Sequence, residues 1–98
     1  MDHLMDLLTS CVELLDSTRE TYWSGVITTA IKDKKALGEK AFLKGILSWY
    51  GAMGSFDDLV ISEYNDHHIK GRSEEDVNRE LDQVRSAIYR EVVSLLKV

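Results

Sequence analysis

An apolar stripe near the end of the chain constrains its fold more than any other feature. Six apolar residues recur there at three- and four-residue steps, the spacing of one face of an α-helix: Val77, Leu81, Val84, Ile88, Val92 and Leu95. Ser73 precedes the stripe as a capping residue, and acidic residues follow it where the positive end of a helix favours negative charge. The pattern predicts a helix of about 24 residues, from Ser73 to about Lys97, that is roughly 36 Å long.

Three further helices are predicted from shorter apolar stripes, at about residues 2–16, 19–34 and 36–50. The chain contains no proline, so a helix continues until a glycine or a cap ends it, and Gly51 is placed to end the third. With 98 residues the chain is long enough for one hydrophobic core. The expected fold is all-α: a compact single-domain bundle, residues 1–98, of about four main helices with an irregular acidic connection before the long C-terminal helix.

The connection between the third and fourth helices is the least regular part of the chain. Gly51 and Gly54 allow a tight reversal with positive φ. Ser55, followed three residues later by Asp58, has the form of a helix cap and predicts a single helical turn through Leu59. Val60 and Ile61 could instead extend as a strand. Polar residues then dominate residues 63–72, which predicts an exposed loop.

Negative charge is concentrated in this connection and the start of the helix that follows. Residues 55–82 contain nine acidic and three basic residues, a net charge of −6 in a chain whose total is −5. The rest of the chain is therefore slightly basic. An acidic surface of this kind favours a positively charged partner, most commonly a basic protein. Nucleic acid is not an expected partner, because the lysines form only a modest cluster with no stripe to neutralise phosphates.

Membrane insertion and secretion are not expected. No apolar run approaches the ~18 residues that a membrane span requires, and the first residues, Met1-Asp2-His3, lack the basic region of a secretory signal. Cys11 is the single cysteine, so no internal disulfide is possible, and its place on an apolar helix face predicts a buried thiol. These features predict a cytoplasmic protein.

No enzymatic, metal or cofactor site is predicted from the motifs. Gly51 to Ser55 is rich in glycine but lacks the spacing and the lysine of a phosphate-binding loop. Asp57 and Asp58 do not follow the calcium-loop pattern. His67 and His68 are adjacent, and neighbouring side chains do not readily bind one ion, so a solvated pair of loop histidines is expected.

Tyr64 is the aromatic residue that does not fit a core position. It lies in a polar segment between Glu63 and Asn65-Asp66, whereas Trp23, Trp49 and Tyr50 have the apolar spacing of their helices. An exposed aromatic side chain surrounded by charged residues is typical of an anchor in a protein–protein interface. A solubilising acidic surface without a partner is the alternative interpretation.

One stretch resembles a family of short bacterial helical proteins: Trp49-Tyr50-Gly51-Ala52-Met53-Gly54-Ser55-Phe56-Asp57-Asp58-Leu59, followed by Glu80-Leu81-Asp82 and then Arg85-Ser86-Ala87-Ile88-Tyr89. In that family a Gly-x-Met-Gly-Ser-Phe/Leu-x-Asp-Leu turn joins a helical front half to a long last helix. The size, acidity and helical composition are also similar in style to the immunity proteins of contact-dependent growth inhibition systems. That similarity implies a small cytoplasmic protein that binds and blocks one toxin domain, often a basic nuclease.

The expected function is therefore that of an immunity protein, an antitoxin-like inhibitor that occludes the active site of a cognate basic toxin domain such as an RNase. A small helical adaptor or regulator that binds another protein partner is the alternative. An enzyme is not expected, and the sequence leaves the oligomeric state open. The candidate partner-binding residues are Asp57, Asp58, Glu63, Tyr64, Asp66, Glu74 and Glu75.

Overall fold

The computed structural model describes residues 1–51 and 53–97 and confirms the all-helical fold. Its four α-helices are α1 (Asp2–Ser17), α2 (Thr21–Leu37), α3 (Glu39–Leu47) and α4 (Glu74–Leu96). Two short 3-10 turns, η1 (Phe56–Asp58) and η2 (Glu63–Asn65), lie in the connection between α3 and α4. Ala52, which belongs to the glycine-rich turn, and Val98 lie outside the described residues.

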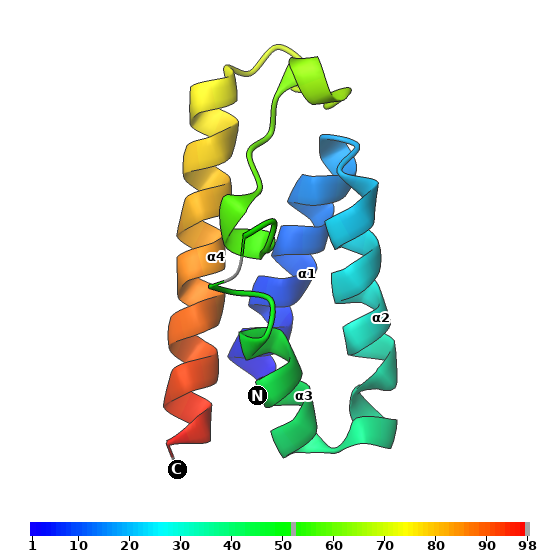
Figure 1. The fold of residues 1–98 in the computed structure, drawn as a ribbon, viewed down its shortest axis with the longest axis vertical. Helices are drawn as coiled ribbons and strands as arrows, with labels where there is room; N and C mark the ends of the chain where they lie inside the picture. The colour runs from blue at the N-terminus through cyan, green and yellow to red at the C-terminus, as the bar shows by residue number, and fades with distance from the viewer. Residues whose placement is uncertain (52, 98) are drawn as a thin grey trace.

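The helices alternate in direction (Figure 1). Because α3 is short, the connection after it covers the remaining length of the bundle. α1 packs between α2 and α4, while α3 packs against both α2 and α4. After α3 the chain passes η1 beside the middle of α4 and reaches η2 at the end of the molecule where α4 begins. The two chain termini lie toward the opposite end. The connection is thus placed along the bundle where a longer third helix would otherwise lie.

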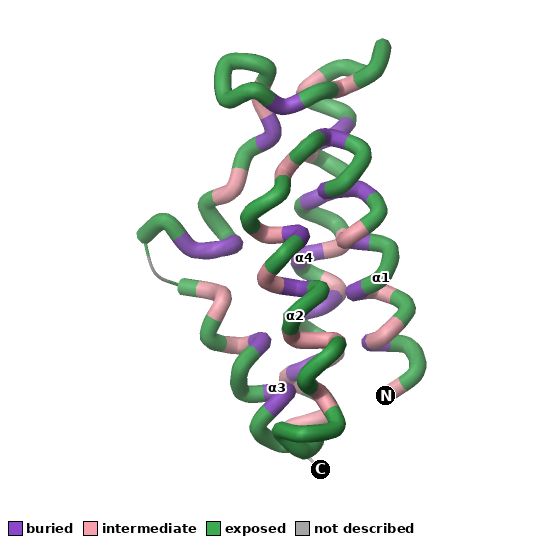
Figure 2. The backbone as a smooth tube through the Cα atoms, turned by 90° about the vertical axis from the view of Figure 1, so that its right-hand side faces the viewer, coloured by how far each residue is buried: buried purple, intermediate pink, exposed green. Residues whose placement is uncertain are grey.

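The core is built from the predicted stripes. α1 contributes Leu4, Leu8, Cys11 and Leu15, and α4 contributes Val77, Leu81, Ile88 and Val92. Buried positions recur along the inner sides of these helices, whereas the loop around η2 is mostly exposed (Figure 2). Burial raises the pKa of the Cys11 thiol to about 12, with Arg85 acting in the opposite direction. The expected buried thiol is confirmed, and it stays protonated at neutral pH.

The boundaries of the second and third helices differ from the predicted ones. The second and third helices were expected at residues 19–34 and 36–50, but α2 continues to Leu37 and α3 covers only Glu39–Leu47. Gly38, with φ of 86°, makes the break between them. After Leu47 the chain tightens, because Trp49 and Tyr50 donate backbone hydrogen bonds three residues back, and the left-handed Gly51 (φ 91°) then ends the turn.

Phe56 attaches the glycine-rich turn to the core. Its fully buried ring lies 5.0 Å from Trp23, 6.1 Å from Trp49 and 5.8 Å from Tyr50, measured between ring centroids. The single helical turn at η1 is confirmed, but the predicted cap is wrong: Ser55 makes no capping hydrogen bond, and its buried hydroxyl has no partner among the described residues. Val60 and Ile61 belong to no helix or strand, and Ile61 is buried.

Substitution of Gly54 is expected to destabilise the fold through backbone conformation alone. Gly54 has φ of 75°, and a Cβ atom added there meets no atom within 4 Å. Gly54→Ala should therefore cost on the order of 1 kcal/mol, and Gly54→Val more, because L-residues disfavour positive φ. Gly45→Ala is the matched control, since Gly45 lies within α3 and its added Cβ also meets nothing. Equal melting temperatures for Gly54→Val and the wild type would contradict the expectation.

Candidate partner-binding surface

The seven predicted partner-binding residues occupy two separate places on the molecule. Asp57 and Asp58 belong to η1, beside the middle of α4 (Figure 1). The other five lie in η2, directly after it, or in the first turn of α4, and we call this group the acidic end: Glu63, Tyr64, Asp66, Glu74 and Glu75. All seven are close in sequence, within residues 57–75. The fold instead divides them along the length of the bundle.

Asp57 and Asp58 stabilise the turn in which they lie. The Gly51 amide donates to Asp57 Oδ2 at 3.2 Å, and the Gly54 amide donates to Asp58 Oδ2 at 2.7 Å. Both side chains are nevertheless exposed. Each carboxylate therefore supports the turn with one oxygen and presents its charge to solvent.

The acidic end combines charged residues with an aromatic side chain that is almost fully exposed to solvent. Tyr64 is 97% exposed, and Glu63 and Asp66 beside it are also exposed. The Glu63 amide donates to Glu74 Oε2 at 3.0 Å, which joins η2 to the start of α4. Glu75 forms an exposed ion pair with Arg79, 3.0 Å away, and such pairs contribute little to stability. Tyr64 thus has the exposure expected of an interface anchor.

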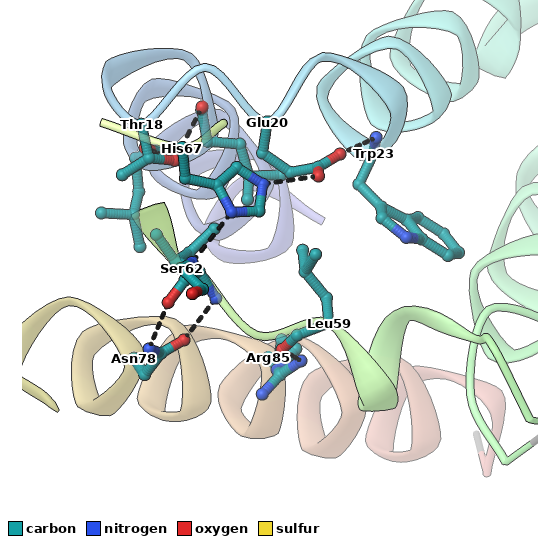
Figure 3. Close-up of polar contacts among 11 residues, drawn as sticks. Thr18, Glu20, Trp23, Leu59, Ser62, His67, Asn78 and Arg85 are labelled. Atoms are coloured by element: carbon teal, nitrogen blue, oxygen red, sulfur yellow. Dashed lines mark hydrogen bonds and ion pairs between the residues drawn. The ribbon is translucent and has the colours of Figure 1, made fainter. Parts of the chain in front are cut away.

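A buried histidine holds the segment that carries Tyr64. His67 is only 8% exposed, so the prediction that it is solvated is wrong. Its Nδ1 accepts from the Ser62 amide at 2.9 Å, which assigns the ring proton to Nε2, and Nε2 donates to Glu20 Oε1 at 3.1 Å. Glu20 Oε2 also accepts from the Trp23 amide at 2.8 Å and so caps α2 (Figure 3). Nδ1 thus closes a hydrogen bond within the connection, and Nε2 joins the connection to the α1–α2 corner.

Two residues of α4 hold the other side of the connection. Asn78 accepts from the Ile61 amide at 2.7 Å and donates to the Ile61 carbonyl at 2.9 Å, so it pairs with that residue as a strand would. Arg85 donates to the carbonyls of Phe56 at 2.6 Å and Leu59 at 2.8 Å, and it also pairs with Asp82. Figure 3 shows Asn78 and Arg85 reaching from α4 toward the connection opposite His67. The segment before and after η2 is therefore attached to the bundle on both sides.

Sequence reasoning missed these anchors, although α4 contains a signal for two of them. Asn78 and Arg85 are seven residues apart, or about two helical turns, so they share one face of α4. Arg85 also lies four residues after Leu81 and three before Ile88, within the buried row. Nothing in the spacing of the loop residues distinguishes His67 from the exposed His68. What distinguishes His67 is its place in the fold, where Ser62 and Glu20 both bond its ring.

Replacement of His67 should loosen the segment that carries Tyr64. In His67→Ala, the Ser62 amide and the Glu20 carboxylate lose a buried partner, so the expected loss of stability is about 1–3 kcal/mol. Hydrogen exchange should accelerate at Ser62 and its neighbours. His68→Ala is the control, because His68 is exposed and bonds Thr18 only through its backbone amide, at 2.9 Å. The same loss of stability in both variants would exclude a specific anchoring role for the His67 ring.

An open cleft of about 910 Å³ lies between the end of α3, the η1 turn and α4. Its wall includes Tyr50 and Tyr89, and Asp57, Asp82 and Arg90 also line it. Burial, and to a smaller extent the neighbouring Cys11 and Asp57, raises the pKa of Tyr50. The phenol therefore stays protonated and donates to the Arg85 carbonyl at 2.9 Å. In the described part of the chain no group of three His, Cys, Asp or Glu side chains is placed to hold a metal ion.

Comparison with known proteins identifies a family. The family described as a domain of unknown function, DUF6966, matches residues 16–70, which is more than half of the chain. The chain belongs to this family. The DUF6966 segment begins near Glu20 and ends near His67, so the hydrogen bond between these two side chains joins its two ends. Helix α4 lies outside the DUF6966 match and supplies Asn78 and Arg85.

No curated protein and no solved structure matches the chain. Within the described residues, no helix of this DUF6966 protein has both the length and the apolar character needed to cross a membrane.

Proposed function

We propose that this chain is an immunity protein that binds a basic toxin domain, such as an RNase, and blocks access to its active site. The binding surface is the acidic end, with Tyr64 as its central contact. The exposure of Tyr64 carries the proposal: an aromatic side chain that is 97% exposed stands between two exposed carboxylates at one end of the bundle. Tyrosine is enriched among the residues that dominate binding energy in protein interfaces.

The hydrogen bonds that attach the connection between α3 and α4 to the bundle support the acidic end as the binding surface. A loop that carries binding residues loses conformational entropy when it binds, and a loop that is already ordered loses less. The His67 ring, through Glu20, holds residues 56–67 on one side, and the Asn78 amide and the Arg85 guanidinium hold them on the other. The backbone that carries Tyr64 is thereby held in place before any partner arrives, which is how a preformed inhibitor surface operates.

The charge of the acidic end suggests how inhibition would occur. A nuclease lines its substrate cleft with lysine and arginine residues that contact phosphate. Carboxylates placed over that cleft would pair with these residues and exclude the substrate. Long-range attraction between the two surfaces would also accelerate association, and buried contacts such as Tyr64 would set the dissociation rate.

The proposal predicts that a basic toxin domain is encoded beside this chain, and it is tested by measurement of the binding and the activity of that domain. Glu63→Lys combined with Asp66→Lys should slow association, and the wild-type association rate should fall steeply between ~50 and ~500 mM salt. Tyr64→Ala should weaken binding by about thirtyfold, the equivalent of about 2 kcal/mol, mainly through faster dissociation. Asp6→Lys is the control, since Asp6 is an exposed acid on α1 outside the acidic end.

The outcomes separate the two candidate functions. Binding with loss of toxin activity supports an immunity protein, whereas binding without inhibition supports the helical adaptor or regulator. An association rate that does not depend on salt, together with equal binding by all the variants, would overturn the assignment of the acidic end as the interface.

A further inference from the structure

The cleft between the η1 turn and α4 has a composition that the acidic end does not share. Tyr50 and Tyr89 contact each other edge to face in its wall, with ring centroids 5.2 Å apart and an angle of 64° between the ring planes. Tyr89 is 45% exposed. A cation is attracted to the face of an aromatic ring, and a partly desolvated site strengthens the attraction. The cleft therefore presents an aromatic surface to any group that enters it.

Two carboxylates line the cleft beside this aromatic surface, and they differ in whether a cation of the protein already pairs with them. Asp82 pairs with Arg85, whose guanidinium is buried and also donates to the Phe56 and Leu59 carbonyls. The charge of Arg85 is thus countered within the protein. Asp57 forms no ion pair among the described residues; its Oδ2 accepts one hydrogen bond from the Gly51 amide, and the side chain is exposed. Asp57 is the carboxylate in the cleft that is available to an incoming cation.

The combination of aromatic rings and a carboxylate fits an arginine side chain better than a lysine. A planar guanidinium stacks on tyrosine rings and also forms paired hydrogen bonds with a carboxylate, whereas an ammonium is a compact, strongly hydrated charge. At about 910 Å³ the open cleft has room for an arginine side chain and the residues on either side of it. Arg90 also lines the cleft, and its positive charge repels an incoming arginine.

We infer that this cleft receives an arginine side chain of the partner. Its guanidinium contacts the aromatic wall formed by Tyr50 and Tyr89 and pairs with the Asp57 carboxylate. The inference rests on the proposed function for the identity of the partner, because a basic toxin domain would supply the arginine. It adds a second contact beside the middle of α4, away from the acidic end. The opposing charge of Arg90 limits the affinity of the site.

The site is tested on the full chain with the peptide acetyl-Gly-Arg-Gly-amide as the probe, observed by NMR chemical-shift changes. The peptide should shift resonances of Tyr50, Tyr89 and Ser86, with a dissociation constant in the millimolar range expected for one side chain. The same peptide with citrulline, which is neutral, should cause no comparable shifts, and the lysine peptide should bind more weakly. Shifts confined to the acidic end, or equal shifts with citrulline, would overturn the inference.

Three variants test the roles of individual residues in the cleft. Asp57→Asn keeps an acceptor for the Gly51 amide but removes the charge, and should weaken binding of the arginine peptide by about fivefold or more. Tyr89→Leu should weaken it by about two- to fivefold, while Arg90→Ala should strengthen it by about two- to fivefold. Asp6→Asn, at an exposed position of α1, is the control and should change nothing. Unchanged affinity in both Asp57→Asn and Tyr89→Leu would exclude the site.

The peptide experiment and the toxin experiment fail independently. If the arginine peptide binds and no toxin is inhibited, the cleft is a guanidinium site and the proposed function is wrong. If a toxin is inhibited but Asp57→Asn binds both the peptide and the toxin as the wild type does, the immunity role stands and this inference is wrong.

Discussion

Ile88→Ala should lower the free energy of unfolding by about 2–5 kcal/mol, a large share of the ~5–15 kcal/mol that stabilises a domain of this size. Ile88 is fully buried in the middle of α4, within the row formed by Leu81 and Val92. Removal of its side-chain carbons leaves a cavity that the surrounding helices can fill only in part. Chemical denaturation followed by circular dichroism measures the loss.

Gln83→Ala is the matched control for this substitution. Gln83 is an exposed residue of the same helix, so its truncation should change stability by less than ~0.5 kcal/mol. Similar denaturation midpoints for Ile88→Ala and Gln83→Ala would show that α4 does not pack on the core through the Ile88 face.

Arg85→Met should cost about 3 kcal/mol or more, even though methionine keeps much of the apolar volume. The Phe56 and Leu59 carbonyls would lose the guanidinium that donates to both, and Asp82 would lose its ion pair. The contact of the guanidinium with the Phe56 ring, 5.8 Å from its centroid, would also disappear. Denaturation reports the total loss, and hydrogen exchange should show that residues 56–62 become less protected than the four α-helices.

Arg79→Met provides the comparison for Arg85. Arg79 lies on the same helix and pairs with Glu75 and Asp76, but these pairs are exposed to solvent and contribute at most about 1 kcal/mol. The two substitutions remove the same charge from the chain. Equal losses of stability would mean that the buried hydrogen bonds of Arg85 add nothing beyond that charge.

Helix α4 was predictable from the sequence to within about a residue, because its boundaries depend on local chemistry. Ser73 caps it through a 3.0 Å hydrogen bond from the Asp76 amide, and three acidic residues occupy its first turn. The division between α2 and α3 was less predictable. Gly38 lies among helix-forming residues. A glycine there can either continue a helix or end it, and the sequence pattern does not distinguish the two.

In the candidate site, too, features that depend on neighbouring residues were predictable, and features that depend on distant residues were not. The exposure of Tyr64 follows from its polar neighbours, and the prediction that it is exposed is confirmed. The burial of His67 depends on Glu20, 47 residues earlier, and the role of Arg85 depends on carbonyls up to 29 residues away. Hydrophobic periodicity contains no information on such pairs. Local composition and charge suggested the candidate binding residues, but not the contacts that hold their segment in place.

The placement of the two chain termini affects how partners can be sought. Both ends lie toward the part of the bundle opposite η2 (Figure 1). An affinity tag or a fluorescent protein fused at either terminus would therefore leave Tyr64 and its neighbouring carboxylates unobstructed. Immobilised through such a tag, the chain would point its acidic end away from the support, so that capture of a basic toxin domain could be measured directly on a sensor surface.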